Sequence, residues 1–350
     1  MELLFSNFPP MRTRMATFTD TFYSLIPRAN QLDIAVGYIT SDALIELKKT
    51  AELNNIEKLN LIIGMHYWDK FTEVEYRTAM DLNEYLTDDN RGEVRLVTPF
   101  RFHGKMYSYA NADGPFAGII GSNNLSSIIE GGNSVYEAAV LISDATGAQQ
   151  MQQFISELSR TSTENISALD IHQFKTDNLL LENHEHVEQV DAVMLAECLA
   201  ARTDVTFNIP IKGDEVSPQS NLNAFFGKGR ESKNGLVKPR HWYEVELIVP
   251  SMVTSQLHYP QSKTDEAVFD VITDDGWKFK CKVSGDYSKN FRSENDLKIL
   301  GKWLKGRLEN SGALSVGKPV TQETLRRYGR DTFTLTKTKI PNLWYLDFSV

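Results

Sequence analysis

Over the first 163 residues, short apolar runs alternate with segments in which apolar residues recur at helical spacing. Apolar runs typical of buried strands lie at 32–39, 59–65, 93–99, 117–122 and 136–143. Helical spacing occupies 41–53, with Ser41 as the expected N-cap, and also 72–86 and 146–162. Strands that alternate with helices predict an α/β domain in which helices cover a largely parallel or mixed sheet.

The pattern changes after residue 163. Residues 164–202 are acidic and partly helical in period, which is typical of a linker arm. Beyond residue 202 the expected strands are short and lie at 204–211, 242–250, 267–273, 277–283, 332–338 and 343–349. We therefore predict three parts: an α/β domain at 1–163, a linker at 164–202 and a mostly β, barrel-like domain at 203–350.

One helix, at 293–309, is expected to interrupt the strands of the last part. Ser293 and Asp296 have the spacing of a capping box at its start. Its apolar stripe consists of Leu297, Leu300, Leu304 and Leu308.

The composition is that of an ordinary globular chain of two domains. Of the 350 residues, 41% are hydrophobic, and the length allows two separate cores. No apolar run is long enough to span a membrane, and the N-terminal residues lack the apolar segment of a signal peptide. The two cysteines, Cys198 and Cys281, are far apart, so we expect incidental thiols in a cytosolic chain.

The net charge of −9 is an average over two unlike parts. Residues 1–200 hold 14 Lys and Arg against 28 Asp and Glu, a net of −14. Residues 201–350 hold 23 against 18, a net of +5. A basic part beside an acidic one indicates a polyanion as partner, although a solvated basic surface gives the same count.

The segment FRFHGKMYSYANADG (100–114) places an imidazole and an ammonium two residues apart, at His103 and Lys105. In a strand, such residues point to the same face, and Gly104 between them permits close packing on the other. A neutral imidazole nitrogen can attack phosphorus while an ammonium binds the non-bridging oxygens. Alone, the pair is a weak signal, and an ordinary surface strand is the better interpretation of it.

Two later segments supply a context for this pair. The sequence GSNN (121–124) ends an apolar run with small residues, so Ser122 shapes a turn or lends a hydroxyl, and Asn124 is presented as a donor. Glu137 stands at the start of the next apolar run, where its carboxylate could orient the imidazole. The predicted catalytic residues are His103, Lys105, Ser122, Asn124 and Glu137.

HxK followed by GSxN resembles the motif of the phospholipase D superfamily. The resemblance implies two copies of the motif in one site: one His attacks the phosphate and forms a phosphohistidine, and the other protonates the leaving oxygen, with no metal or other cofactor. This chain has one HxK, so we expect a homodimer through the first domain. The Asp that usually follows the Lys is absent, because position 110 is alanine, and the spacing from Lys105 to Gly121 is longer than in the common motif.

Two loops of the basic part gather side chains that suit phosphates and base edges. From the loop at 217–238 we predict DNA contacts by Asn221, Asn223, Lys228, Arg230 and Lys233. From the loop at 282–293 we predict contacts by Lys282, Tyr287, Lys289, Asn290 and Arg292. The alternative is that both are ordinary polar loops.

The segments KPRHWYEVEL, SGDYSKNFRS and LGKWLKGRLE, behind such a motif, resemble the NgoFVII family of type II restriction endonucleases, and the catalytic half is similar to BfiI. The resemblance implies a phospholipase D-like nuclease domain and a B-three-like pseudobarrel that grips DNA with the two loops as arms. It implies site-specific, metal-independent cleavage of double-stranded DNA, a cognate DNA methyltransferase and a bacterial, cytoplasmic location. Whether a helicase or ATPase partner takes part is left open.

Two other functions stay open at this point: a sequence-specific DNA-binding protein with an inactive first domain, and another phosphodiesterase of the superfamily. For the second, no stretch resembles a membrane-binding segment, so no membrane partner is expected. His66 and Asp69, after the second strand, are candidates for a supporting substrate contact.

The linker raises two further hypotheses. His184 and His186 fit either a metal site or a solvated linker, and no third ligand stands at a suitable spacing, so we predict no metal. Its acids could also lie across the phosphate site and restrain the nuclease until DNA binds. These acids are Glu182, Glu185, Glu188 and Asp191.

Overall fold

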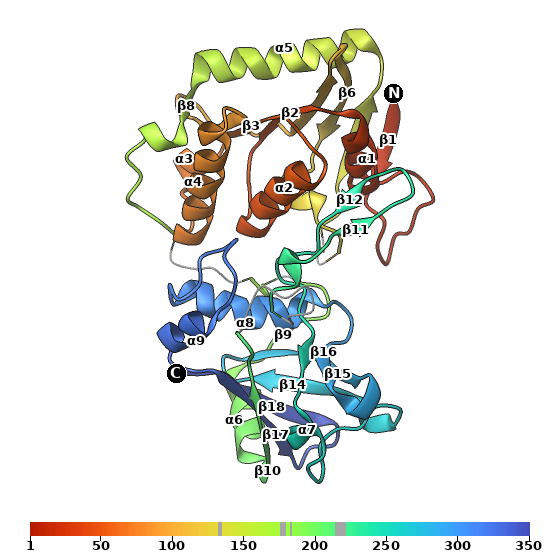
Figure 1. Cartoon of the computed structure of the whole chain (residues 1–350), viewed down its shortest axis with the longest axis vertical. Helices are drawn as coiled ribbons and strands as arrows, with labels where there is room; N and C mark the ends of the chain where they lie inside the picture. Colours follow the sequence, from red (N-terminus) through yellow and green to blue (C-terminus); the bar gives the residue numbers. More distant parts are fainter. Residues whose placement is uncertain (132–134, 176–179, 183, 214–221) are drawn as a thin grey trace. The chain divides into compact units, whose positions relative to one another are not determined.

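The computed structural model describes residues 1–131, 135–175, 180–182, 184–213 and 222–350 (Figure 1). The chain forms two compact units. The first comprises Met1–Glu130, Val135–Asn178 and Gly229–Pro239, and the second comprises Gly131–Ser134, Leu179–Lys228 and Arg240–Val350. The expected domain boundaries at 163 and 203 stay predictions. Residues 229–239 were expected in the last domain, but they belong to the first unit.

A mixed β-sheet forms the centre of the first unit. Its strands are β1 (Glu2–Phe5), β2 (Gln31–Val36), β3 (Lys58–Ile63), β4 (Gly92–Val97), β5 (Met106–Asn111), β6 (Gly114–Gly121), β7 (Ala138–Ile142) and β8 (Thr163–Asn165). Their order is β1-β7-β6-β5-β2-β3-β4-β8. The central strands β2, β3 and β4 run parallel, and the other neighbours are antiparallel. The predicted mixed sheet is confirmed.

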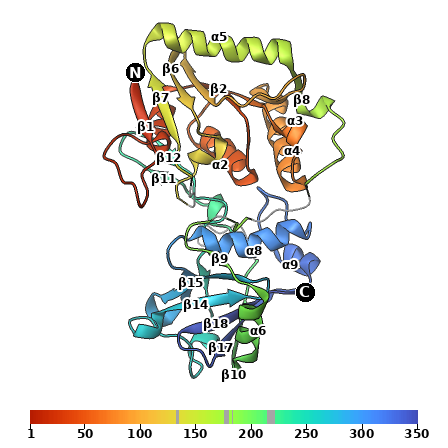
Figure 2. The same ribbon diagram turned by 180° about the vertical axis from the view of Figure 1, so that it is seen from behind.

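Helices cover both faces of this sheet (Figures 1 and 2). On one face lie α1 (Phe18–Leu25), α2 (Ser41–Leu53) and α4 (Glu73–Asp88), and α5 (Ala145–Ser162) crosses the other. Ile34 and Val36 of β2 belong to the core under α2, whereas Ala35 belongs to the core under α5. Strands buried on both faces have continuous apolar sequences, which explains why these strands could be located beforehand.

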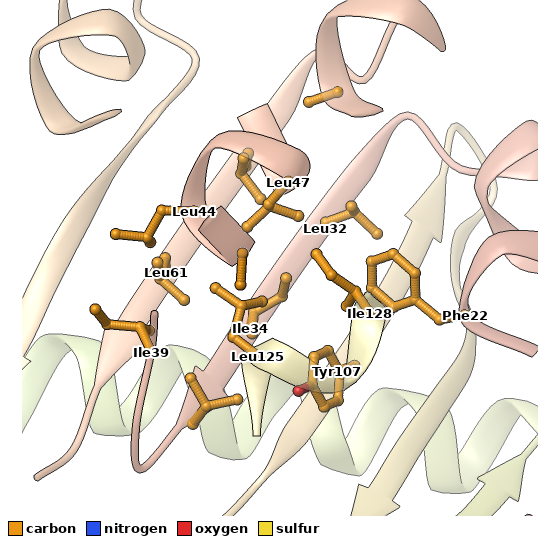
Figure 3. Close-up of a cluster of buried hydrophobic side chains, with 14 of the residues drawn as sticks. Phe22, Leu32, Ile34, Ile39, Leu44, Leu47, Leu61, Tyr107, Leu125 and Ile128 are labelled. Atoms are coloured by element: carbon orange, nitrogen blue, oxygen red, sulfur yellow. The ribbon is translucent and has the colours of Figure 1, made fainter. Parts of the chain in front are cut away.

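The larger core lies between the sheet and the helices α1 and α2 (Figure 3). Leu125 and Ile128 belong to it and are buried. They come from the short helix η2 (Leu125–Ile128), which follows Asn124 directly. The core therefore anchors the segment on which Asn124 stands.

The second unit is mostly β, as predicted. Its main sheet contains β10 (Arg202–Pro210), β13 (Leu247–Ile248), β14 (Val268–Thr273), β15 (Trp277–Ser284), β16 (Asn290–Ser293), β17 (Thr332–Thr338) and β18 (Leu343–Asp347), with β9 (Glu188–Gln189) beside β15. Its helices are α6 (Ala192–Ala200), α7 (Ser251–Thr254), α8 (Lys298–Asn310) and α9 (Gln322–Tyr328). Aromatic rings of Phe207, Phe269, Phe291 and Trp344 pack against one another inside it.

The helix at 41–53 has the predicted bounds, but its predicted N-cap is wrong, and so is the predicted start of the helix at 293. Thr40 is the N-cap of α2, and its hydroxyl bonds to Asp42. At α8 there is no capping box, because Ser293 still pairs with Cys281 in the sheet and its hydroxyl donates to the carbonyl of Asp296. The helix begins only at Lys298.

The strand expected at 242–250 is wrong over most of its length. Only Leu247–Ile248 pair in the sheet. Trp242 and Tyr243 instead lie in a turn, where the indole N–H and the phenol O–H each donate to a carboxylate oxygen of Glu309 at 2.7 Å. Aromatic residues that are buried because their N–H and O–H groups have a partner produced the apolar pattern without forming a strand.

A short hairpin from the second half of the sequence completes the first unit. Its strands are β11 (Arg230–Glu231) and β12 (Val237–Lys238). The Asn54 side chain at the end of α2 donates to the Val237 carbonyl and accepts from its N–H, both at 2.9 Å. Leu236 is buried in the main core, and Lys238 forms an ion pair with Glu130 at 2.7 Å. We call residues 229–239 the docked hairpin.

Part of the expected linker belongs to the second unit. Glu188 forms an ion pair with Lys278 at 3.5 Å, and Asp191 caps α6 by accepting the N–H of Met194. Both acids thus have partners within that unit, and a restraining role for the linker stays a hypothesis. Within the part of the chain that the structure describes, no helix is both long and apolar enough to cross a membrane.

Candidate active site

The loops that follow β2, β3 and β6 and the segment before β5 bring polar side chains to one edge of the first sheet. Lys105 immediately precedes β5, and its carbonyl accepts the N–H of Gly121 at the end of β6. At the end of β2, a Cβ atom on Gly37 would lie 3.3 Å from the His103 ring and 3.6 Å from the Asn124 Oδ1. His103 and Asn124 therefore lie next to each other, with the Gly37 backbone between them.

Lys105 and His103 are in direct contact. The Lys105 Nζ lies 3.0 Å from Nδ1 and 3.2 Å from Nε2 of His103, and it donates to the His103 carbonyl at 2.7 Å. A neutral imidazole has one nitrogen with a lone pair, so one ring contact at a time is a hydrogen bond. The pair does not lie in a regular strand, yet Gly104 makes the expected close approach: a Cβ there would lie 2.5 Å from the Phe102 ring.

The environment of Lys105 differs from that of its neighbour. Lys105 is buried, whereas the His103 side chain is exposed. Burial lowers the pKa of Lys105 because it disfavours the ammonium, and the nearby Glu137 carboxylate acts in the opposite direction. The result is a shielded cation beside an accessible imidazole, which is the arrangement needed to bind a phosphate next to a nucleophile.

The backbone after β2 fixes the amide of Asn124. The Tyr38 N–H donates to the Asn124 Oδ1 at 3.1 Å. Because the amide oxygen is engaged there, the NH₂ group points the other way and is left as the donor for a ligand. The sequence had indicated Asn124 as a donor, but its partner is a backbone group, which has no signature in the sequence.

Ser122 joins the GSNN turn to the start of β7. Its hydroxyl accepts the Ala138 N–H at 3.1 Å, and its own N–H donates to the Ala138 carbonyl at 3.0 Å. These bonds hold the residue next to Glu137, whose N–H donates to the Ser6 hydroxyl at 2.9 Å. Of the two roles considered for Ser122, shaping the turn is the one with contacts in the structure.

The Glu137 carboxylate favours the charged form of Lys105. Its carboxylate stabilises the Lys105 ammonium, as the opposing effect on the Lys105 pKa indicates. Among the described residues, no hydrogen bond joins Glu137 to His103. The predicted role in orienting the imidazole therefore stays a prediction, beside the electrostatic effect on Lys105.

Asp69, a predicted candidate in the loop after β3, is bonded to two residues that the sequence analysis did not find, Tyr38 after β2 and Arg101 after β4. The Tyr38 hydroxyl donates to Asp69 at 2.6 Å, and Arg101 pairs with the same carboxylate at 3.3 Å. These bonds lower the pKa of Asp69, that of Tyr38 foremost. The Tyr38 ring stands edge-on to the His103 ring, with centroids 5.8 Å apart. For Arg101, the sequence did contain a signal: it lies two residues before His103, the same spacing as that between His103 and Lys105.

His66 supports the fold of this loop and does not face substrate. It is buried, its Nε2 accepts the Ile39 N–H at 3.2 Å, and its Nδ1 lies 3.2 Å from the Lys70 carbonyl. Burial lowers its pKa to about 4, so the ring is neutral at physiological pH. A direct substrate contact by His66 is not supported.

The described residues were also compared with the requirements of a metal site. Within them, no three His, Cys, Asp or Glu side chains gather in a way that could hold an ion. His184 is buried with its Nδ1 at 2.8 Å from the Glu185 carbonyl, and His186 pairs with the Glu185 carboxylate. The linker histidines therefore have protein partners of their own.

In the second unit, the loop at 282–293 is a hairpin of β15 and β16 with one polar face. Lys282 pairs with Arg292 across the strands, and Ser284 pairs with Asn290, so all four side chains share one face. The opposite face carries the buried Cys281, Val283, Phe291 and Ser293. Lys278 and Lys280 lie on the polar face of β15 as well, and their period-2 spacing in WKFKCKV would have identified them.

The tip of this hairpin presents an aromatic side chain. Tyr287 is 86% exposed and has a left-handed backbone with φ of 58°, and the adjacent Lys289 is exposed. Ser288 is also left-handed, and its buried hydroxyl accepts the Ser262 N–H at 2.8 Å. Two successive non-glycine residues in this region are unusual, and the hydroxyl bond holds them.

The residues predicted in the loop at 217–238 are divided between the two units. Asn221 lies outside the described residues. Asn223 is fully buried, and its amide bonds to both the N–H and the carbonyl of Val320 at 2.8 Å, so it stabilises the fold and does not face DNA. Lys228 is exposed in the second unit, whereas Arg230 and Lys233 are exposed on the docked hairpin of the first.

Two family descriptions match almost the whole chain. Residues 16–172 match the NgoFVII restriction endonuclease N-terminal PLD domain, and residues 197–339 match the NgoFVII C-terminal B3-like DNA-binding domain. The chain belongs to the NgoFVII restriction endonuclease family. Its first unit thus contains a phospholipase D-like nuclease domain, and the β15–β16 hairpin lies within a B3-like DNA-binding domain. No match was found among curated proteins.

Solved structures resemble parts of this NgoFVII-family chain. Phosphatidylserine synthase from Haemophilus influenzae is 15% identical over 48% of this chain and 41% of its own, with a TM-score of 0.37. Nuc, a phospholipase D family member from Salmonella typhimurium, is 16% identical over 47% of this chain and 95% of its own, with a TM-score of 0.29. Polyphosphate kinase from Porphyromonas gingivalis is 13% identical over 51% of this chain and 26% of its own, with a TM-score of 0.32. The chain spans less than half of the synthase.

Proposed function

We propose that this chain is a site-specific, double-stranded DNA endonuclease that acts as a homodimer and requires no metal. The observation that carries the proposal is the contact of the Lys105 Nζ with the His103 ring beside the fixed amide of Asn124. Membership of the NgoFVII family supplies DNA as the substrate class.

In the proposed reaction, a ring nitrogen of His103 forms a bond to phosphorus while the bond from phosphorus to the leaving sugar oxygen breaks. The partner's His103 donates a proton to that oxygen. Water then attacks the phosphohistidine, gives its proton to the partner's His103, and frees the ring. Lys105 and Asn124 bind the non-bridging oxygens throughout, and they stabilise the charge that develops on them.

The homodimer follows from the single HxK motif of the chain. The mechanism needs a nucleophile and a separate proton donor, and a two-fold axis through the site supplies the second imidazole. Sedimentation of the active enzyme is expected to give a dimer. A monomer with full activity would contradict this part of the proposal.

For DNA recognition we propose the polar face of the β15–β16 hairpin with Tyr287 at its tip. Lys282 and Arg292 would bind phosphates, and Asn290 would reach a base edge. Lys289 belongs to the same surface. Lys228, Arg230 and Lys233 remain proposed phosphate contacts of lesser weight, since they are divided between the two units.

The decisive experiment is cleavage of a panel of unmethylated plasmids in the presence of EDTA. Discrete fragments from the wild-type chain and none from His103→Ala are expected, with DNA binding retained by the variant. His172→Ala is the matched control, because His172 is an exposed histidine paired with Asp170. Binding without any cleavage by the wild type would favour a DNA-binding protein with an inactive first domain.

Two partners are proposed with this activity. A cognate DNA methyltransferase would protect host DNA, and plasmids methylated in the source organism should resist the enzyme. Cleavage by the purified chain alone would show that no helicase or ATPase is needed. Cleavage that appears only after such a partner and ATP are added would establish the opposite.

A further inference from the structure

A group of exposed side chains lies beside the proposed phosphate site. Tyr67 and Trp68, in α3 (His66–Asp69), are 42% and 43% exposed, and the Arg101 side chain is 59% exposed. The Arg101 guanidinium lies 5.6 Å from the Trp68 ring centroid, and the Tyr67 ring meets Trp68 edge-on at 5.8 Å. We call Tyr67, Trp68 and Arg101 the aromatic–arginine platform.

The platform is joined to the catalytic residues by an unbroken series of contacts. Arg101 pairs with Asp69, and Asp69 accepts the Tyr38 hydroxyl. The Tyr38 ring stands against His103, and its N–H holds Asn124. A ligand on the platform therefore lies next to a phosphate bound at His103, Lys105 and Asn124.

The loop that carries the aromatic rings is firmly held. The N–H groups of Trp68 and Asp69 both donate to the Met65 carbonyl, at 3.0 and 2.9 Å. The buried His66 ring is bonded on both sides and stacks on Phe71 with centroids 4.5 Å apart. Exposed aromatic rings on a fixed support offer contact area at little cost in conformational entropy, which is the property of a binding surface.

The chemistry of the platform fits a nucleotide. An indole ring offers a face for a base to stack on, and this contact tolerates every base because each has a π-face. The guanidinium has five N–H donors, and the bond to Asp69 uses one of its nitrogens, so donors remain for a phosphate. The Trp68 ring thus suits the base of a nucleotide, and the neighbouring Arg101 guanidinium suits its phosphate.

We propose that the aromatic–arginine platform binds the nucleotide adjoining the scissile phosphate, with its base on Trp68 and its phosphate on Arg101. The proposal rests on the proposed function and adds a subsite to it. Bases inside a duplex already stack on their neighbours, so this nucleotide must leave the stack to reach Trp68. The enzyme would thus distort the strand next to the bond it cuts.

The first test locates the contact without requiring cleavage. The full chain carrying His103→Ala is irradiated with a thymidine oligonucleotide that contains one 5-iododeoxyuridine, and the attached peptide is identified by mass spectrometry. Attachment to the peptide that contains Tyr67 and Trp68 is expected. Attachment only to peptides of the second unit would overturn the proposal, even if the wild-type enzyme cleaves DNA.

The second test measures cleavage kinetics on a plasmid that the wild-type enzyme cuts. Trp68→Ala should raise KM about fivefold or more, and Trp68→Phe should restore most of the loss. Arg101→Ala should also raise KM, whereas Arg77→Ala should leave it unchanged. Arg77 is matched because it is 65% exposed and also forms an ion pair, with Glu73 on α4.

Sedimentation of the variants completes the design. Trp68→Ala is expected to keep the oligomeric state of the wild type. If the variant dissociates into monomers, the platform is a contact between two copies of the chain and the nucleotide assignment is wrong. An unchanged KM in Trp68→Ala, with wild-type cleavage intact, would also overturn the proposal while leaving the nuclease function in place.

Discussion

At the scale of single residues, Lys105 is a buried cation beside an acid that favours its charged form. Burial lowers its pKa, and the Glu137 carboxylate partly restores it. Replacing that carboxylate by an amide removes a stabilising anion from the ammonium. In the variant the Lys105 pKa falls further, and the charged form disappears at a lower pH.

Glu137→Gln is therefore expected to move the alkaline limb of the cleavage rate toward lower pH, because phosphate binding needs the Lys105 ammonium. Single-turnover rates measured from neutral to alkaline pH check this. Asp113→Asn is the control, since Asp113 is an exposed acid in the turn between β5 and β6. Equal loss at every pH without a shift would assign Glu137 to the imidazole of His103 instead.

The residues of the site differ in how visible they were in the sequence. His103, Lys105 and Asn124 have motif spacing, and the structure brings them together. Tyr38 was missed because its bond to Asn124 is made by a backbone N–H, which every residue but proline carries. Asn223 was assigned to DNA because polar residues in loops suggest contacts, but an amide can instead satisfy a buried backbone, as it does at Val320.

At the scale of elements, the docked hairpin is anchored by the buried Leu236 as well as by its bonds to Asn54 and Glu130. Leu236 is buried in the core of the first unit, although it comes from the second half of the sequence. Leu236→Ala should reduce the free energy of unfolding by about 2 kcal/mol or more. Denaturant titration of the full chain measures this loss.

The control for that variant is Lys233→Ala, in the exposed turn of the same hairpin. It should change stability by less than about 0.5 kcal/mol, as surface substitutions usually do. If Leu236→Ala were equally neutral, burial of Leu236 would contribute nothing to the stability of the first unit.

The polar face of the β15–β16 hairpin makes a prediction about salt. Each phosphate contact that is lost should reduce the slope of log affinity against log salt by about 1. Lys280→Ala, on the exposed side of β15, should show this change in a DNA-binding titration. Lys318→Ala, an exposed lysine outside the hairpin, should keep the wild-type slope. Identical slopes in the two variants would remove Lys280 from the DNA surface.

Elements with a strong period were predictable, and short ones were not. The buried strands β2, β3 and β4 and the helices between them follow directly from apolar runs and helical spacing. The strand expected around Trp242 failed because burial of aromatic rings against Glu309 produced the same pattern. The docked hairpin was taken for a DNA arm, since no local signal shows that Leu236 packs against a core made by residues far away in sequence.

At the scale of the whole molecule, the proposed dimer shares two copies of His103 in one site. Mixing wild-type chains with His103→Ala chains then gives mixed dimers that lack one imidazole. Activity should fall with the square of the wild-type fraction, to about one quarter in an equal mixture. Sites confined to single chains would instead leave about one half.

The mixing experiment needs chains that exchange partners, so they are combined unfolded and refolded together. A mixture of wild type with His172→Ala, treated in the same way, should keep full activity. A linear decline with His103→Ala would reject the shared site while leaving the nuclease assignment unaffected.

The docked hairpin limits how such a gene can recombine. A crossover in the linker that replaced the second half by that of a relative would also replace Leu236, yet the core that buries this side chain would come from the other parent. Chains built by exchanging halves should therefore need a hairpin that matches the core of the first unit. An exchanged second half would thus bring residues 229–239, which complete the first unit, along with the domain that it was meant to replace.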